Sequence, residues 1–243
     1  METLHDTSSA LSLLKKVNQC QNEQQLETIL HQLTQHLGFE HFFYRARFML
    51  DRSSSLDRVL SNFPLAWLQH YENNNLSRID PALQHAERKL TPMVWEPKIF
   101  VTEEQKRFSA DAKRHGLESG VSFPVHNKDG DIGMLSLVLG ADVVDASEFI
   151  QENLFYGPLI ANFVHEAMSR LVNKSGRALK APLTPRELEC LKWIAGGKST
   201  WETAQILHLS EHGVLHHVRN IMTKFDVTSR HQAVSRAVAC GLV

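Results

Sequence analysis

The sequence predicts two domains of different fold class, an α+β domain followed by an all-α domain. In the first ~170 residues, segments with helical spacing of apolar residues alternate with strand-like segments. In the last ~60 residues, four helix starts follow one another at close spacing and no strand pattern occurs. We therefore expect an α/β/α sandwich with a mostly antiparallel sheet over residues 1–172, a linker over 173–182 and a four-helix domain over 183–243.

Length and composition exclude several classes of protein. The chain has 243 residues, of which 42% are hydrophobic and 22% charged, as in ordinary globular proteins. No apolar run is long enough to cross a membrane and the N-terminus has no apolar signal core, so we expect a cytoplasmic protein without a membrane partner. Three cysteines without a Cys-x-x-Cys pair argue against a disulfide framework and against a zinc site.

Apolar spacing predicts that the first domain begins with two helices within residues 11–37, the second of which Gly38 ends. Asp80 and Pro81 read as the N-cap and the first residue of a later short helix. The elements expected after Gly38 are a strand over 42–50, helices over 64–71 and 80–89, an extended piece over 93–95 and a helix over 102–115.

A β-hairpin comes next in the predicted order. Its strands cover residues 121–125 and 132–139, and the sequence Asn127-Lys128-Asp129-Gly130 favours a tight turn between them. One long amphipathic helix is expected over residues 146–171, bent near Gly157-Pro158. The polar segment 173–182 then has the composition of a linker.

The last domain is marked by repeated helix starts. In a capping box, a Ser or Thr caps the helix and a Glu or Gln three residues later bonds back to it. Three such boxes and a fourth cap begin at Thr184, Ser199, Ser229 and Ser210. Four short helices with short connections are typical of a helix-turn-helix domain, which most often lays one helix in the DNA major groove. The alternative is a small bundle that binds protein. The net charge of only +2 from residue 183 onward (seven Lys/Arg, five Asp/Glu) favours this alternative, because DNA binding depends on neutralising phosphates.

The third of these helices, residues 211–225, provides the candidate DNA-reading face. Val214, Val218, Ile221 and Phe225 share one side at helical spacing and are expected in the core. Arg219 is the preferred base reader because its guanidinium pairs with guanine through two bonds. The candidate DNA contacts are His212, His216, Arg219, Asn220, Thr223 and Lys224.

Candidate binding residues in the first domain are polar or aromatic groups in apolar surroundings. Trp67 and Tyr71 are four residues apart and lie on one side of a helix. The same spacing is also typical of an aromatic pair that only packs in the core. Trp95 reads as a core residue. Ser136 interrupts an apolar strand on the same side as Met134, and a buried Ser requires a hydrogen-bond partner.

Both halves resemble one known family. The DNA-binding domain of LuxR-family regulators is similar to the segments Leu183–Glu187, Leu191–Ser199 and Ile221–Phe225. The order Trp67, Tyr71, Asp80, Trp95, Gly120, Ser136 resembles the autoinducer-binding domain of LuxR-type receptors for acyl-homoserine lactones. Departures from the family pattern are Gly213 and Leu215 on the reading helix, where polar or basic residues are usual, and Phe63, where many members carry Tyr.

The resemblance implies a role for each pocket residue. The Trp67 N–H would donate to the lactone carbonyl, and the Tyr71 O–H, alone or with Ser136, to the acyl carbonyl. Asp80 would accept from the amide N–H, which is the only donor of the ligand. Trp95 would pack over the lactone ring. Phe63 and Met134 complete the expected ligand-binding set, and Met134 would limit the room for the acyl chain.

The leading hypothesis is a transcriptional regulator that binds an N-acyl homoserine lactone and, as a homodimer, a palindromic DNA site. The alternative is a lactone-binding sensor with weak DNA binding that acts by heterodimerising with another regulator. An enzyme is not expected, because the sequence has no nucleophile elbow or metal motif, and neither a cofactor nor a metal site is predicted. A two-component receiver is not expected either, since no βαβ repeat precedes the tail.

Overall fold

The computed structural model describes residues 7–49, 55–140, 143, 145–172, 182–239 and 242–243. The chain forms two compact units, and the last division between them falls at Leu171–Val172. The linker predicted over 173–182 lies outside the described residues except for Pro182. Within the described ranges, no helix is long and apolar enough to cross a membrane.

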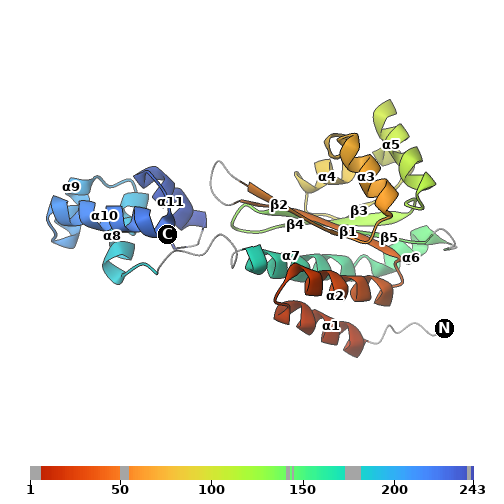
Figure 1. Ribbon diagram of the computed structural model, residues 1–243, viewed down its shortest axis with the longest axis horizontal. Helices are drawn as coiled ribbons and strands as arrows, with labels where there is room; N and C mark the ends of the chain where they lie inside the picture. Colours follow the sequence, from red (N-terminus) through yellow and green to blue (C-terminus); the bar gives the residue numbers. More distant parts are fainter. Residues whose placement is uncertain (1–6, 50–54, 141–142, 144, 173–181, 240–241) are drawn as a thin grey trace. The chain divides into compact units, whose positions relative to one another are not determined.

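The first unit is an α/β/α sandwich, as predicted. Its five strands form one sheet in the order β2-β1-β5-β4-β3, and the pairings of β1 with β5, β5 with β4 and β4 with β3 are antiparallel. Helices α3, α4 and α5 cover one face of the sheet, and α1, α2 and α7 cover the other (Figure 1). The strands are β1 (His41–Met49), β2 (Ser55–Ser61), β3 (Met93–Val94), β4 (Gly120–His126) and β5 (Ile132–Val138).

The helices of this unit begin and end near the predicted positions. Asp80 caps α4 with Pro81 as its first residue, and the left-handed Gly38 and Gly116 follow the ends of α2 and α5. The helices are α1 (Thr7–Gln19), α2 (Glu23–His36), α3 (Leu65–Asn73), α4 (Pro81–Ala86), α5 (Glu103–Arg114), α6 (Ala146–Asn153) and α7 (Tyr156–Val172), with short 3-10 turns η1 (Leu76–Arg78) and η2 (Pro97–Ile99).

Two predictions for this unit were wrong. Strand β2 was not expected; four of its seven residues are polar, and only Leu60 is buried. The single helix expected over residues 146–171 is two helices, and α7 restarts at Tyr156. Pro158 then lies in the first turn of α7, where no backbone N–H is needed for the helix. Gly157 lies against the sheet so closely that a Cβ would come within 2.0 Å of Phe123 Cζ.

The second unit contains the four predicted helices: α8 (Pro185–Ala195), α9 (Thr200–Leu207), α10 (Glu211–Phe225) and α11 (Arg230–Ala239). The capping boxes at Thr184, Ser199 and Ser229 are formed in both directions. Ser210 caps α10 by accepting from the Gly213 N–H at 3.1 Å. The core of this unit contains Leu191, Ile221, Phe225, Ala233 and Ala237.

Candidate functional site

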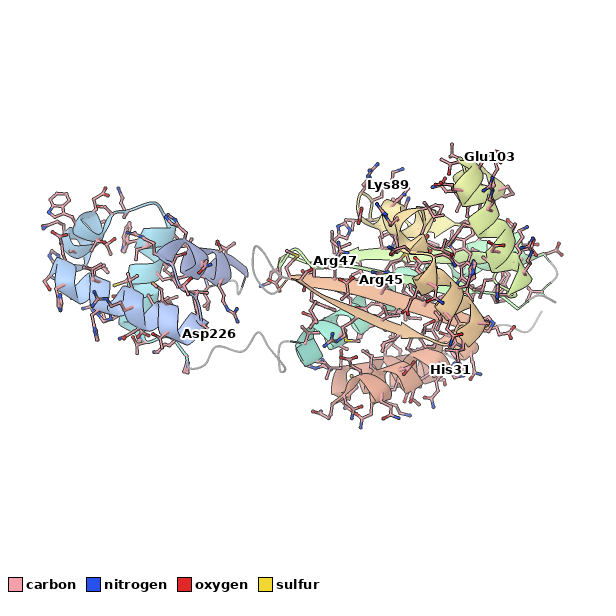
Figure 2. All side chains as sticks on the ribbon, turned by 45° about the horizontal axis from the view of Figure 1, so that its top comes forward. His31, Arg45, Arg47, Lys89, Glu103 and Asp226 are labelled. Carbon is pink, nitrogen blue, oxygen red and sulfur yellow. The ribbon has the colours of Figure 1, made fainter. Side chains whose placement is uncertain are left out.

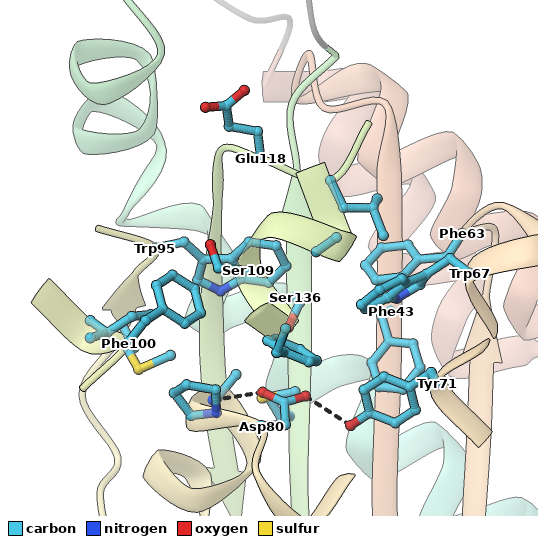
Figure 3. A pocket seen from close by; sticks show the side chains of 18 residues that line it. Phe43, Phe63, Trp67, Tyr71, Asp80, Trp95, Phe100, Ser109, Glu118 and Ser136 are labelled. Carbon is cyan, nitrogen blue, oxygen red and sulfur yellow. Dashed lines mark hydrogen bonds between the residues drawn. The ribbon is translucent and has the colours of Figure 1, made fainter. Parts of the chain in front are cut away.

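A narrow cavity lies in the first unit between the sheet and helices α3, α4 and α5 (Figure 3). Its volume is about 40 Å³, room for one or two water molecules. The walls are mostly aromatic and aliphatic, and a single carboxylate, Asp80, faces inward from their buried part. All seven predicted ligand-binding residues line this cavity: Phe63, Trp67, Tyr71, Asp80, Trp95, Met134 and Ser136.

Asp80 is 8% exposed and holds two hydrogen bonds at once. Its Oδ1 accepts from the Ala82 N–H at 2.8 Å, which caps α4, and its Oδ2 accepts from the Tyr71 O–H at 2.8 Å (Figure 3). Burial raises the pKa of Asp80, while the bonds from Tyr71 and Ala82 oppose this rise. A carboxylate with two oxygens can accept further bonds, so Asp80 still offers an acceptor to the cavity.

Tyr71 differs from the expectation. The resemblance implied that its O–H donates to a ligand carbonyl, but in this structure that proton points to Asp80. Burial, followed by the negative charge of Asp80, raises the pKa of Tyr71 far above its usual value, so the hydroxyl keeps its proton. In this state Tyr71 offers the cavity lone pairs and no donor, because a hydroxyl has only one proton.

Trp67 supplies an open donor. Trp67 is 3% exposed, and its ring makes a tilted contact with Tyr71 at 6.0 Å and an edge contact with Phe108 at 5.5 Å between ring centroids. The indole N–H has no acceptor among the residues that the structure describes. A ligand carbonyl in the cavity could therefore accept a hydrogen bond from this N–H without displacing another acceptor.

Trp95 and Ser136 are joined by a residue that the sequence did not single out. Ser122 on β4 is fully buried, accepts from the Trp95 indole N–H at 2.9 Å and lies 2.8 Å from the Ser136 hydroxyl. The two serines face each other in the register of β4 and β5. Sequence distance hid this link, since Trp95 and Ser122 are 27 residues apart.

Phe63 and Met134 form apolar parts of the cavity wall. Phe63 packs on Phe43 with ring centroids 5.4 Å apart, and Met134 is 2% exposed. Phe63 therefore contributes an apolar surface at the position where a tyrosine would have added a hydroxyl. This leaves Asp80, Tyr71, Trp67 and Ser136 as the main polar groups of the deep cavity.

The second unit presents the predicted reading face on α10. Val214, Ile221 and Phe225 are buried and Val218 is half-buried, so the opposite face is open. Arg219 is exposed, and its guanidinium forms no hydrogen bond or ion pair with any described residue. The other predicted DNA contacts on this face are exposed His212, His216 and Thr223 and half-buried Asn220, whose amide lies 3.2 Å from His216 Nε2.

Lys224 has a role inside the domain that was not predicted. Its ammonium donates to Glu187 Oε2 at 2.7 Å and to the Pro182 carbonyl at 2.9 Å. The Glu187 side chain is only 3% exposed and also accepts from the Thr184 N–H. Any contact of Lys224 with DNA therefore competes with this ion pair.

No group of three His, Cys, Asp or Glu side chains that could hold a metal occurs in the part of the chain that the structure describes. The histidines of the second unit at positions 208, 212 and 216 therefore do not form such a group.

Comparison with known families covers both units. Residues 22–168 match the autoinducer binding domain, and residues 181–237 match the family described as bacterial regulatory proteins, luxR family. Together these matches span most of the chain, and each coincides with one of the two units described above.

Individual relatives agree with these matches. The chain is 33% identical to the transcriptional activator protein SolR of Ralstonia solanacearum, over 92% of this chain and 94% of SolR. It is 29% identical to the transcriptional activator protein VanR of Vibrio anguillarum, over 96% of this chain and 97% of VanR. The crystal structure of Escherichia coli SdiA has the same fold, with a TM-score of 0.77, 24% identity and coverage of 97% and 98%. Another structure of SdiA contains octanoyl-rac-glycerol.

Proposed function

Because the chain belongs to the LuxR family of quorum-sensing transcriptional regulators, with an autoinducer-binding domain and a DNA-binding domain, we propose that its ligand is an N-acyl homoserine lactone. We further propose that it acts in the cytoplasm as a homodimer, without a cofactor, on a palindromic DNA site. The curated relatives are transcriptional activators, and a regulator of this kind needs no catalytic residue.

The observation that supports this ligand is the pairing of one buried acceptor with one open donor in an apolar cavity. Asp80 offers an oxygen, and Trp67 offers an N–H without a partner among the described residues. An N-acyl homoserine lactone has one amide N–H and several carbonyl oxygens beside an apolar chain, so it complements both groups. Each of these polar ligand atoms would cost about 1–3 kcal/mol if it were buried without a partner.

The small volume of the cavity suggests how binding is coupled to folding. The free volume of about 40 Å³ is small for an acyl lactone, so we expect the cavity walls to move apart when the ligand binds and the ligand to become part of the core. A ligand that binds only the folded domain stabilises it by about 2.7 kcal/mol at a concentration one hundred times Kd. We therefore expect ligand binding to raise the thermal stability of the first domain.

Thermal unfolding of the full chain with a series of N-acyl homoserine lactones of graded chain length tests the ligand class. Octanoyl-rac-glycerol serves as a second probe, because it has an acyl chain and a carbonyl but no amide N–H for Asp80. A larger shift with a lactone supports the proposal. Stabilisation by the acylglycerol alone would assign another ligand class, and no shift with any lactone would contradict the proposal.

The proposed dimer surface is the outer side of the α6–α7 region. Most of α7 is buried against the sheet, but Phe155 is 91% exposed and Leu159 is 45% exposed. Phe155→Asp and Leu159→Asp should shift the ligand-bound protein toward the monomer in sedimentation and weaken its binding to a palindromic operator. Leu65→Asp is the matched control, because Leu65 is 70% exposed at the start of α3. Equal behaviour of all three variants would contradict this surface.

One observation favours a second candidate, a sensor that acts through heterodimers. Leu215 is 41% exposed on α10, one turn before Arg219, where an apolar side chain cannot bond to phosphate or base edges. If the protein acts through heterodimers because Leu215 weakens its own DNA binding, Leu215→Arg should create tight operator binding in gel shifts. Tight operator binding by the wild type would exclude this candidate.

A further inference from the structure

The chain Trp95–Ser122–Ser136 determines the direction of a hydrogen bond in the cavity. Trp95 Nε1 is a donor only, and it donates to the Ser122 hydroxyl at 2.9 Å. Ser122 lies 2.8 Å from Ser136, and this contact permits either serine to be the donor. The two directions place different groups in the cavity: a free Ser136 proton or only its lone pairs.

Burial selects between the two directions. Ser122 is 0% exposed, and its hydroxyl has no hydrogen-bond partner besides Trp95 and Ser136 within the described ranges. If Ser136 donated to Ser122, the proton of Ser122 would be buried without an acceptor, which is unfavourable. If Ser122 donates to Ser136, the proton of Ser136 is directed to the cavity, where a ligand can accept it. The second direction satisfies every polar group once a ligand is bound.

We infer that Ser122 is a positioning residue that, held by the Trp95 indole N–H, makes Ser136 the hydrogen-bond donor to the acyl carbonyl of the ligand. This inference rests on the proposed function, because it requires an acyl amide in the cavity. Tyr71 does not compete for the role, since its only proton is donated to Asp80 at 2.8 Å. Three neutral donors in series also polarise one another, which strengthens the final bond.

The assignment divides the recognition of the amide between two walls of the cavity. Asp80, at the start of α4, accepts from the amide N–H, while Ser136, on β5, donates to the carbonyl of the same amide. Figure 3 shows both residues facing the cavity. A ligand without an acyl carbonyl would leave the Ser136 proton unpaired, and therefore this serine pair selects for acylated ligands.

A ligand with a weakened acceptor tests the inference. Binding to the purified full chain is measured with the tightest-binding N-acyl homoserine lactone of the graded series and with its thioamide, whose sulfur is a poor acceptor. The readout is the ratio of the two Kd values within each variant, so general damage to the fold cancels. For the wild type we expect the thioamide to bind about tenfold more weakly, as for the loss of one buried hydrogen bond.

Four variants resolve the chain of donors. In Ser136→Ala the two Kd values should become equal. In Ser122→Ala the ratio should fall to about threefold, although Ser136 is retained. Trp95→Phe keeps a ring in place and removes only the donor, so it should act like Ser122→Ala. Ser122→Thr restores a hydroxyl and should restore the ratio. Ser109→Ala removes another hydroxyl from the cavity wall, on α5, and should leave the ratio at the wild-type value.

Three results would overturn the inference. An unchanged ratio in both Ser122→Ala and Trp95→Phe would mean that Ser136 donates without support. Equal binding of amide and thioamide by the wild type would mean that Ser136 does not donate to the carbonyl. If no lactone binds the wild type at all, the proposed function fails first and the inference fails with it.

Discussion

Replacing Asp80 by Asn should separate ligand binding from the stability of the fold. Asn is as good an N-cap as Asp, so the bond from the Ala82 N–H to the side-chain oxygen at 2.8 Å is retained and α4 loses little stability. The second oxygen, which accepts from the Tyr71 O–H, becomes an NH₂ group that can only donate, so the Tyr71 hydroxyl must turn and accept from this group. The NH₂ group then faces the amide N–H of the proposed ligand, donor against donor.

The magnitude follows from the bond that is lost. A hydrogen bond to a charged acceptor contributes about 1.5–3 kcal/mol, and the upper end applies because Asp80 is only 8% exposed. A loss of about 2.8 kcal/mol weakens lactone binding about a hundredfold. Titration calorimetry of the Asp80→Asn variant against the wild type measures this difference. A Kd within threefold of the wild-type value would refute the reasoning.

The ligand-free protein provides the control for the same substitution. Burial raises the pKa of Asp80 in the folded protein above its unfolded value of about 3.9. The contribution of this carboxyl to stability is therefore complete at pH values below the unfolded pKa and is lost as the pH rises through the raised pKa. Asn does not titrate, so the ligand-free variant should be as stable as the wild type or more stable near neutral pH. A large loss of stability there would show that the carboxylate itself is needed for folding.

Three further predictions concern other sites. Lys224→Met should destabilise the second unit by about 2 kcal/mol in urea unfolding, because it leaves the Glu187 carboxylate buried without its partner. Burial favours a higher pKa of Glu187, but its bonds to Lys224 and to a backbone amide outweigh this and lower the pKa. The destabilisation should therefore be full above the unfolded pKa of about 4.3 and shrink as the pH falls through the lowered pKa. Gly157→Ala should cost the first unit about 1–3 kcal/mol in thermal unfolding, because its Cβ would lie 2.0 Å from Phe123 Cζ, and an unchanged midpoint would contradict the packing. Arg219→Ala should reduce operator binding by about 1–3 kcal/mol but change binding to a scrambled sequence much less, and equal losses on both in gel shifts would mean that Arg219 contacts only phosphate.

Local sequence signals were sufficient for most of the elements, whereas the resemblance to the LuxR family identified seven of the 18 residues that line the cavity. Capping boxes predicted the starts of α8, α9 and α11 because a cap depends on residues only three apart. The break between α6 and α7 was missed because Gly157 and Pro158 are compatible with a bend as well as with a new helix. The close approach of Gly157 to Phe123 depends on how α7 packs on the sheet, which the local sequence does not show.

The polarity of the cavity could not be predicted from the sequence. Ser122 became visible only through the register of β4 and β5, which brings it opposite Ser136. The pairing of Tyr71 with Asp80 likewise depends on how α3 and α4 meet. The sequence therefore predicted part of the cavity lining, whereas the rest of the lining and the direction of each donor follow only from tertiary contacts.

The contact between Asn220 and His216 on α10 has a consequence for how DNA sequence is discriminated. The Asn220 amide already lies 3.2 Å from an acceptor on the same helix face, so a base contact exchanges one hydrogen bond for another. A matching base replaces the hydrogen bond that the Asn220 amide loses with His216, whereas a mismatched base does not replace it. If Asn220 contacts a base as predicted, it adds little to the total affinity for DNA and acts mainly against mismatched sequences, and most of the affinity then comes from Arg219 and from contacts to phosphates.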